Sequence, residues 1–242
     1  MRHCFRVDAR TAIRPTPGLT TLPWSATPEE ERALAEVGRA MQACPYGAPD
    51  EATQQWFLRD RRLAVDAAVD KLTAYMKWRA EFLPLEGLTW EDVADQAGSG
   101  KAYLHAHLDV NGRPVIVVRV SKHVTGEFPL DSSKRYCAYV LEQAIARLSD
   151  DCETILGIFD LRGFRTRNAD FGFVRFLVDV FFLYYPKRLG QVLFVDAPWG
   201  FQPGWELVKP WLKKYAALVR FVSVQQLREE FFTPETLPED FA

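Results

Sequence analysis

Two aspartates at the ends of apolar runs are the residues that most directly suggest chemistry in this chain. Asp160 follows ILGIF and Asp196 follows QVLFV. Such runs are typical of buried parallel strands, and active sites often lie where such strands end. Two carboxylates at one edge of a sheet could act as a general acid and a general base. No GxSxG, HExxH or GxGxxG motif accompanies them, so we expect no enzymatic activity.

Two histidines in one alternating stretch raise the question of a metal site. His105 and His107 are separated by one residue, so in a strand both side chains point to the same side. Zinc needs further ligands, and no Glu or Cys recurs at a suitable spacing. We interpret these histidines as polar residues on a strand face and expect neither a metal nor another cofactor.

The run Gly98-Ser99-Gly100-Lys101 looks like part of a phosphate-binding P-loop. The complete motif requires a glycine at position 95, where this chain has Asp95, and no strand precedes the run. We therefore predict no nucleotide site here and interpret the run as the end of a short helix.

The composition limits the classes of protein that the chain can represent. The 242 residues are 48% hydrophobic and 26% charged, as in an ordinary globular protein. The formal net charge is -2, so no overall basic field attracts nucleic acid. The four cysteines form no CxxC pair, and we expect reduced thiols in the cytoplasm. They are Cys4, Cys44, Cys137 and Cys152.

No stretch of the sequence is long and apolar enough to span a membrane, which takes about 18 residues or more. The run that begins at Phe171 comes nearest, but Arg175 and Asp179 interrupt it. We expect this run to form a helix that is buried on most of its circumference and ends before Pro186. The protein is predicted to be peripheral to membranes.

The first 26 residues carry four arginines and few acids. Two interpretations remain open: residues 1–26 are a flexible basic arm, or they are a residual targeting segment for a plastid or another organelle. The arginines are Arg2, Arg6, Arg10 and Arg14.

The elements that must position any site begin with three helices. Thr27-Pro28-Glu29-Glu30 combines a capping residue, a proline at the first helical position and a glutamate three residues after the cap. This predicts a helix to about Met41. Apolar spacing predicts further helices at about 50–60 and 65–82. We therefore predict a small all-α module over residues 27–84.

Strand patterns then predict an α/β domain over residues 85–242. AYLHAHLDV and PVIVVRV flank Asn111-Gly112, which predicts a hairpin with a type I′ turn. Three more strands are expected at about 154–160, 191–196 and 220–224, with helices between them and one at the end. Strands that alternate with helices after an initial hairpin predict a mostly parallel sheet with flanking helices.

A helix with two apolar faces is expected after the run APWGF. Trp205, Val208 and Leu212 share one face, Leu207 and Trp211 lie on another, and lysines lie between them. One interpretation is a lid that covers an apolar cavity and touches a membrane on its outer side. The other is a core helix covered by the C-terminal tail. On the lid interpretation, the gate and membrane-contact residues are Trp205, Leu207, Val208, Trp211, Leu212, Lys209 and Lys213.

Short motifs follow one another along most of the chain. They are Asn111-Gly112-Arg113-Pro114, Asp160-Leu161-Arg162-Gly163, Tyr184-Tyr185-Pro186, Asp196-Ala197-Pro198-Trp199 and Lys209-Pro210-Trp211-Leu212. Together with matching stretches before and after them, they extend over about residues 50–242. In this order they resemble the Sec14-like, or CRAL-TRIO, family of lipid-binding proteins. The resemblance implies the CRAL-TRIO fold and the family activities of lipid binding and phosphatidylinositol transfer.

The resemblance also implies roles for individual residues. Asp160 and Asp196 occupy family positions at turns, which implies turn hydrogen bonds and not catalysis. A basic pair, alone interpretable as a solvated turn, falls where many members hold a lipid phosphate, and guanidinium groups suit phosphate oxygens. The predicted headgroup residues are Arg61, Arg62, Lys187, Arg188 and Arg220. The predicted pocket lining is Val117, Ile158, Phe173, Leu177, Phe181, Phe194 and Phe201.

The chain departs from the family at positions that select the lipid. Lys187 stands where many phosphatidylinositol-binding members have an acidic residue. Ile155 and Gly157 stand where some members place hydroxyl groups against phosphatidylcholine. These departures favour a phosphoinositide, phosphatidic acid or an isoprenoid-type small lipid. We predict a carrier that exchanges such a lipid at membrane surfaces. The alternative is a lipid-sensing regulatory module that recruits a protein partner without net transfer.

Overall fold

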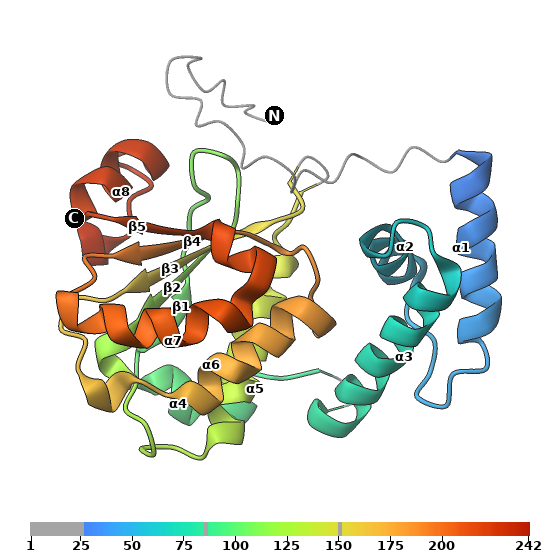
Figure 1. Cartoon of the computed structure of the whole chain (residues 1–242), viewed down its shortest axis with the longest axis horizontal. Coiled ribbons are helices and arrows are strands. Elements are labelled where there is room, and N and C mark those ends of the chain that lie inside the picture. The colour runs from blue at the N-terminus through green and yellow to red at the C-terminus, as the bar shows by residue number, and fades with distance from the viewer. Residues whose placement is uncertain (1–26, 85–86, 150–151) are drawn as a thin grey trace. The chain divides into compact units, whose positions relative to one another are not determined.

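The computed structural model describes residues 27–84, 87–149 and 152–242 (Figure 1). The arm or targeting segment predicted at residues 1–26 lies outside the described residues. The α-helices are α1 (Pro28–Met41), α2 (Glu51–Asp60), α3 (Val65–Phe82), α4 (Ala94–Gly98), α5 (Leu130–Ile145), α6 (Phe171–Asp179), α7 (Gln202–Leu212) and α8 (Val224–Phe231). The strands are β1 (Ala102–Leu104), β2 (Val115–Arg119), β3 (Ile155–Asp160), β4 (Leu189–Val195) and β5 (Val219–Val222).

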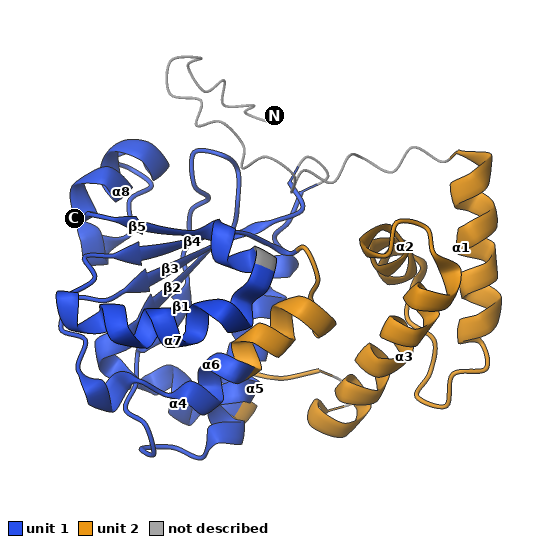
Figure 2. Cartoon of the chain, viewed as in Figure 1, with its two compact units in different colours: residues 1–21, 93–175, 188–242 blue, residues 22–92, 176–187 orange. Residues whose placement is uncertain are grey.

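The described residues form two compact units (Figure 2). Unit 1 holds residues 93–175 and 188–242, and unit 2 holds those within 27–92 together with 176–187. The three helices predicted near the N-terminus belong to unit 2, which also takes in the end of the Phe-rich segment. The division into separate domains at residue 84 stays a prediction.

Unit 2 consists of capped helices around an apolar core. The Thr27 hydroxyl accepts a hydrogen bond from Glu30 N at 3.2 Å, and the Glu30 carboxylate accepts one from Thr27 N at 3.0 Å. This arrangement confirms the predicted capping box. Asp50 caps α2 in a similar way, at 2.8 Å from Thr53 N. The core residues are Ala33, Val37, Met41, Phe57, Leu58, Ala68, Leu72 and Tyr75.

The sheet of unit 1 has five strands in the order β1-β2-β3-β4-β5. β1 pairs with β2 in antiparallel fashion, and the other neighbours are parallel. Each parallel connection passes through one of the helices α5, α6 and α7. The predicted mostly parallel sheet with an initial hairpin is confirmed.

The first hairpin differs from its prediction in two respects. β1 ends at Leu104, well before the end of the strand that the sequence predicted. The turn is not type I′, because Gly112 has a positive φ of 76° and Asn111 does not. Asp109 explains the difference. Its Oδ1 accepts hydrogen bonds from Asn111 N at 3.0 Å and Arg113 N at 2.8 Å, so the turn is built around a carboxylate.

The Phe-rich helix is less enclosed than predicted. α6 ends at Asp179, and Val180–Tyr184 continues the chain as a π-helical turn. Phe176, Val178 and Val180 are buried, but Phe171 and Leu183 are exposed. Most of the other apolar residues of this segment are half-buried, so the expected burial on most of the circumference is met only in part. Within the described residues, no helix has the length and apolarity that a membrane span requires.

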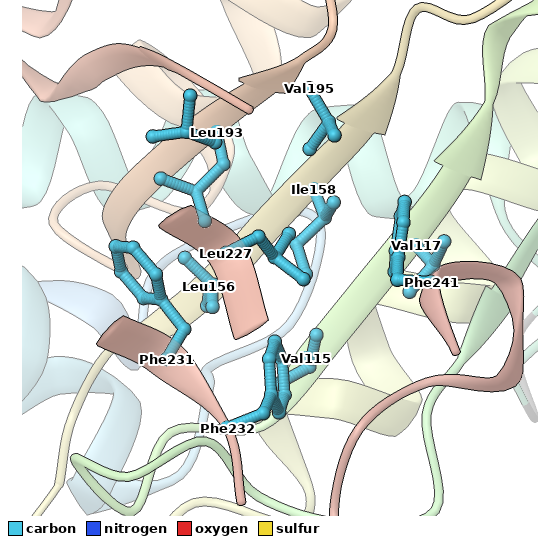
Figure 3. Packing of buried hydrophobic residues seen from close by; sticks show 11 residues of the cluster. Val115, Val117, Leu156, Ile158, Leu193, Val195, Leu227, Phe231, Phe232 and Phe241 are labelled. Carbon is cyan, nitrogen blue, oxygen red and sulfur yellow. The ribbon is translucent and has the colours of Figure 1, made fainter. Parts of the chain in front are cut away.

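One face of the sheet is sealed by the C-terminal elements (Figure 3). Val117, Ile158 and Leu193 lie in register on this face, which we call the closed face. All three are 0% exposed. α8 and the C-terminal residues cover them. The side chains packed there include Leu227, Phe231, Phe232 and Phe241.

The opposite face of the same strands is equally apolar but is not sealed. Val118, Phe159 and Phe194 lie in register and, because side chains alternate along a strand, point away from the closed face. These three residues keep solvent-accessible surface, as does Ile116. Phe221 in β5 is 40% exposed. We call this surface the open face. α4 and α5 cover its β1–β2 end, where Val93, Tyr136 and Val140 form a small cluster with strand residues.

Candidate functional site

Four aromatic rings meet where α7 lies on the open face. Phe194 and Phe221 project from the sheet with ring centroids 5.3 Å apart. Trp205 of α7 contacts them edge to face, at 5.4 Å and 5.7 Å. Phe201, just before α7, lies 5.3 Å from Phe194. We call these residues the aromatic cluster. The geometry is the one that aromatic pairs prefer, so α7 is attached to the sheet by specific contacts.

The two sides of α7 differ as the sequence predicted. Trp205 is 5% exposed and Val208 is also buried, so both face inward. Leu207 is 55% exposed, and Lys209 and Lys213 are exposed beside it. Trp211 and Leu212 are half-buried. The membrane role of this helix stays a prediction.

Trp199 is a candidate membrane residue that the predicted gate set omitted. It precedes α7 in a short 3-10 turn and is 90% exposed, more than any other large apolar residue described. An indole in water is costly unless a partner or a membrane interface covers it. The motif Asp196-Ala197-Pro198-Trp199 pointed to this residue, but helical periodicity could not, because it lies outside the helix.

The backbone is strained at both ends of the segment that carries α7. Asp196, after β4, has φ 45°, and Lys213, after α7, has φ 46°. Residues other than glycine rarely occupy this region, and each costs on the order of 1 to 3 kcal/mol. The segment 197–212 is therefore bounded by two positions where a change in backbone conformation would release strain.

A thiol on α5 is both deep and accessible. Burial raises the pKa of the Cys137 thiol to about 12. The residue nevertheless keeps solvent-accessible surface. Cys137 follows Tyr136, whose side chain packs against the open face, and it is a candidate lining residue that the predicted pocket set omitted.

The predicted pocket lining needs correction at two positions. Val117 and Ile158 pack against α8 on the closed face, whereas Phe194 points to the open face. Residues on opposite sides of a sheet cannot line one cavity, so we remove Val117 and Ile158 from the set. Phe194 and Phe201 belong to the aromatic cluster. Phe173 is half-buried in unit 1, and Leu177 and Phe181 are half-buried in unit 2.

The Tyr184-Tyr185-Pro186 motif is fixed to the helices of unit 2. Trp56 Nε1 donates a hydrogen bond to the Pro186 carbonyl oxygen at 2.7 Å. The ring of Trp78 stacks on Tyr184 with centroids 4.2 Å apart. Lys187 Nζ then donates to the Arg59 carbonyl oxygen at 3.2 Å. These contacts bring Lys187 to the C-terminal end of α2.

Three of the predicted headgroup residues therefore lie in unit 2, two of them on strained backbone. Arg62 has φ 55° and Lys187 has φ 61°. Arg61 forms an ion pair with Asp60, in which Nη2 and Oδ2 are 2.9 Å apart. The Arg62 side chain is exposed and makes no ion pair with the described residues. Unusual backbone beside basic side chains is typical of ligand-binding positions.

The remaining two predicted headgroup residues are in unit 1. Arg188 directly precedes β4, and its Nη1 donates to the Glu153 carbonyl oxygen at 3.2 Å. Arg220 lies in register with Leu193, so it points to the closed face. Glu230 accepts two hydrogen bonds from its guanidinium, at 2.5 Å and 2.7 Å, and these raise the pKa of Arg220. We therefore remove Arg220 from the headgroup set.

The residues that first suggested chemistry have structural partners. Asp160 accepts hydrogen bonds from Arg162 N at 3.1 Å and from Arg162 Nε at 2.9 Å, as expected for turn bonding. His105 is buried, with Nε2 2.8 Å from the Thr236 carbonyl oxygen. His107 is exposed. Burial lowers the pKa of His105, so the neutral ring donates to Thr236.

Comparison with known proteins identifies a matching family and relatives of similar sequence. Residues 97–241 match the family model described as the CRAL/TRIO domain. The chain is 31% identical over 218 residues to "Phosphatidylinositol transfer protein CSR1" of Eremothecium gossypii, covering 85% of this chain and 49% of that protein. It is 25% identical over 256 residues to "SEC14 cytosolic factor" of Kluyveromyces lactis, covering 97% and 85%. This chain thus spans about half of the first relative and most of the second.

A solved structure shares the fold. The crystal structure of Sfh5 superposes with a TM-score of 0.65 at 16% sequence identity, covering 84% of this chain and 83% of that one. The matched family model extends over more than half of the chain, including the whole sheet, α7 and the C-terminal residues. The chain therefore belongs to the CRAL-TRIO family.

Proposed function

We propose that this protein binds one lipid molecule between the open face and α7 and exchanges it at membrane surfaces. The observation that carries the proposal is the contrast between the two faces of one sheet. Val117, Ile158 and Leu193 are sealed, whereas Val118, Phe159 and Phe194, which follow them in their strands and point to the other face, keep accessible surface. A sheet packed against helices on both sides normally seals both faces. An apolar ligand supplies the missing contacts.

The energetics of lipid carriage support an enclosed site. Moving one methylene from hydrocarbon to water costs about 0.8 kcal/mol, so exposing a sixteen-carbon chain costs on the order of 12 kcal/mol. A carrier must therefore surround the chain with apolar groups. The open face, the inner side of α7 and Cys137 offer such groups in unit 1.

The proposed ligand is an anionic phospholipid, of the phosphoinositide or phosphatidic acid kind. A phosphate needs fixed donors, since an unpaired charge away from water is costly. Arg188 is the proposed headgroup residue of unit 1, and the roles of Arg61, Arg62 and Lys187 in unit 2 stay predictions from the family resemblance. The name of the relative CSR1 is consistent with an inositol lipid. An isoprenoid-type lipid would bind without using these arginines, so the headgroup variants distinguish the two classes.

Exchange is proposed to proceed by movement of α7. Trp199 and Leu207 are exposed and apolar, and Lys209 and Lys213 are exposed cations beside them. Tryptophan and lysine together suit the interface of an anionic membrane. Insertion of the apolar pair would pull α7 outward, and the strained residues Asp196 and Lys213 would allow the movement.

A transfer assay between vesicle populations tests the proposal. Donor vesicles carry fluorescent phosphatidic acid or phosphatidylinositol, and arrival in acceptor vesicles is followed over time. Trp205→Asp places a charge in the aromatic cluster and should abolish transfer. Glu206→Gln, on the exposed side of the same helix, is the matched control and should transfer at the wild-type rate.

The outcomes separate the proposal from its alternative. Transfer by wild type and by Glu206→Gln, with none by Trp205→Asp, supports a carrier gated by α7. A lipid that co-purifies but never exchanges would instead indicate a lipid sensor. Wild-type protein that neither binds nor transfers any of these lipids refutes the proposal.

A further inference from the structure

A cluster of three buried polar side chains lies under the β1 end of the sheet. Gln96 comes from α4, Lys101 directly precedes β1, and Ser133 comes from α5. Lys101 Nζ donates hydrogen bonds to Gln96 Oε1 and, at 3.2 Å, to Ser133 Oγ. Ser133 Oγ lies 3.3 Å from Gln96 Oε1 and donates to it. All three residues are buried, and Gln96 is only 2% exposed. The neighbouring apolar cluster of Val93, Tyr136 and Val140 does not need polar side chains at this place.

The orientation of the Gln96 amide is fixed by its neighbours. An ammonium group only donates, so the amide oxygen must face Lys101, and the Ser133 hydroxyl donates to the same oxygen. The Nε2 group consequently points away from both. It finds no hydrogen-bond partner among the described residues. Native proteins rarely leave a buried donor unpaired, and the exceptions are often positions that a ligand or an ion completes.

The cluster is continuous with the accessible side of α5. Ser133 and Cys137 are four residues apart in this helix and therefore lie on the same face. Cys137 is the deep thiol that keeps accessible surface. Tyr136 and Val140 of α5, with Val93 just before α4, pack with Ile116 of the open face, so the helices that supply Ser133 and Gln96 lie on that side of the sheet.

The cluster and Arg188 lie at opposite ends of the sheet. Lys101 stands opposite Arg119, the last residue of β2, with Lys101 O accepting from Arg119 N at 2.7 Å. Arg188 directly precedes β4, which runs parallel to β2 within the same sheet. A strand rises about 3.3 Å per residue, so the two positions are separated by about 20 Å or slightly more along the strands. A headgroup at Arg188 cannot also occupy the cluster.

The charges around Lys101 indicate what the cluster can bind. Burial lowers the pKa of Lys101, while the nearby carboxylates Glu127 and Asp170 raise it. The Phe128 ring lies 5.1 Å from Nζ. The acids offset part of the ammonium charge, so the site does not demand a full negative charge. It offers donors to an oxygen, whether that oxygen belongs to a hydroxyl, a carbonyl or a carboxylate.

We infer that Gln96, Lys101 and Ser133 form an internal binding site for an oxygen atom of the lipid, separate from the headgroup residues. This inference rests on the proposed function, because it assumes that a lipid occupies the open face. It narrows the ligand to a long-chain molecule that carries a hydrogen-bond acceptor at the end buried under α5. The Gln96 Nε2 group donates to that acceptor.

The test compares three eighteen-carbon probes, two with an oxygen function at the chain end and one without oxygen. Delipidated full-length protein is titrated with oleic acid, oleyl alcohol and 1-octadecene, and the bound fraction is measured by native mass spectrometry. Wild type should bind each oxygen-containing probe about tenfold more tightly than the hydrocarbon, the preference expected for one completed hydrogen bond in a buried site.

Gln96→Glu is the decisive variant, because its carboxylate still accepts from Lys101 and Ser133 but replaces the Nε2 donor with an acceptor. The preference for oleyl alcohol over 1-octadecene should disappear, with the melting temperature retained. Gln191→Glu is the matched control. Gln191 Oε1 also accepts from a cation, Arg113, at 3.3 Å, but it lies at the other end of the sheet. This control should keep the wild-type preference. If Gln96→Glu lowers the melting temperature, Gln96→Met replaces it, because it also removes the Nε2 donor and should show the same loss of preference.

Two results would overturn the inference. One is equal affinity of wild type for all three probes, and the other is a preference that survives in Gln96→Glu. If wild type and Gln96→Glu transfer phosphatidic acid between vesicles at equal rates while showing no such preference, the proposed function stands and this inference fails. If wild type binds none of the probes and no phospholipid, the proposed function itself fails.

Discussion

Removing the inward-facing tryptophan of α7 tests whether this helix is a gate. Trp205 is buried and contacts Phe194 and Phe221 edge to face. Truncation of a buried tryptophan to alanine costs about 3 to 5 kcal/mol. If α7 leaves the sheet when the lipid exchanges, the protein with α7 moved away (the open state) no longer makes these contacts. The substitution then destabilises only the closed state, in which α7 lies on the sheet. At the lower figure of about 3 kcal/mol, Trp205→Ala shifts the closed–open equilibrium by roughly 100-fold.

The assay measures the rate at which a fluorescent phospholipid leaves the loaded protein. The lipid acceptor contains no vesicles, so no membrane contact contributes to the rate. Trp205→Ala should release the lipid about 100-fold faster than wild type. Leu207→Ala, on the exposed side of the same helix, should release it at the wild-type rate. Unchanged release by Trp205→Ala, together with a lowered melting temperature, would show that Trp205 stabilises the fold as a whole and that α7 is not the gate.

Three further predictions concern surface and terminal groups. Burial raises the pKa of Asp240, but hydrogen bonds, first of all the one from Arg119, lower it, and the net pKa lies below 3.8. The stability that these hydrogen bonds contribute is therefore present above about pH 4 and is lost as pH falls through the lowered pKa. Asp240→Asn should therefore lower the free energy of unfolding by about 1 to 3 kcal/mol at pH 7 and flatten its acid dependence, measured by denaturant titration from pH 7 to pH 3. Arg62→Gly should raise the melting temperature, because glycine tolerates the positive φ of this position, with a gain of about 1 kcal/mol in stability. The same change should weaken the retention of phosphatidic acid. Retention equal to that of wild type would remove Arg62 from the headgroup set. The double change Trp199→Ala and Leu207→Ala should weaken binding to anionic vesicles about tenfold or more in a sedimentation assay without altering the melting temperature, and unchanged sedimentation would exclude this surface as the membrane contact.

Local patterns were sufficient to predict most of the fold. The capping box at Thr27 and the apolar run of β4 depend on residues a few positions apart, so the sequence displays them directly. The need for glycine at position 190 comes from a contact between distant parts of the chain, which no sequence pattern shows. A Cβ at this position would lie 2.4 Å from Thr154 Oγ1. The hairpin turn was mispredicted for a different reason: the Asn-Gly dipeptide was taken as the signal, but the nearby Asp109 carboxylate determines the turn's backbone.

The site was harder to predict, because it depends on which face of each strand is covered. The run VIVVR in β2 is apolar on both faces, so its periodicity could not show that Val117 belongs to the closed face. Arg220 looked available for a lipid phosphate until the register of β5 placed it beside Glu230 of α8. Gln96 gave no signal, since its polar partners come from elements that are distant in the sequence.

The central claim is that the open face beneath α7 is a lipid site, and filling that space with a side chain tests it most directly. Gly157 lies in the middle of this face, in register with Ile116 and Val192. An added Cβ would have no neighbour closer than 3.6 Å, at Phe159 Cε2, so a β-carbon fits in ordinary van der Waals contact, and we predict that a larger side chain extends into the lipid space. Gly157→Leu and wild type are incubated with vesicles of a total lipid extract and examined by native mass spectrometry. We predict one bound lipid on wild type and none on Gly157→Leu, whose melting temperature is not lowered. A variant that still carries lipid, or one that unfolds because the interior was already filled, would contradict the account.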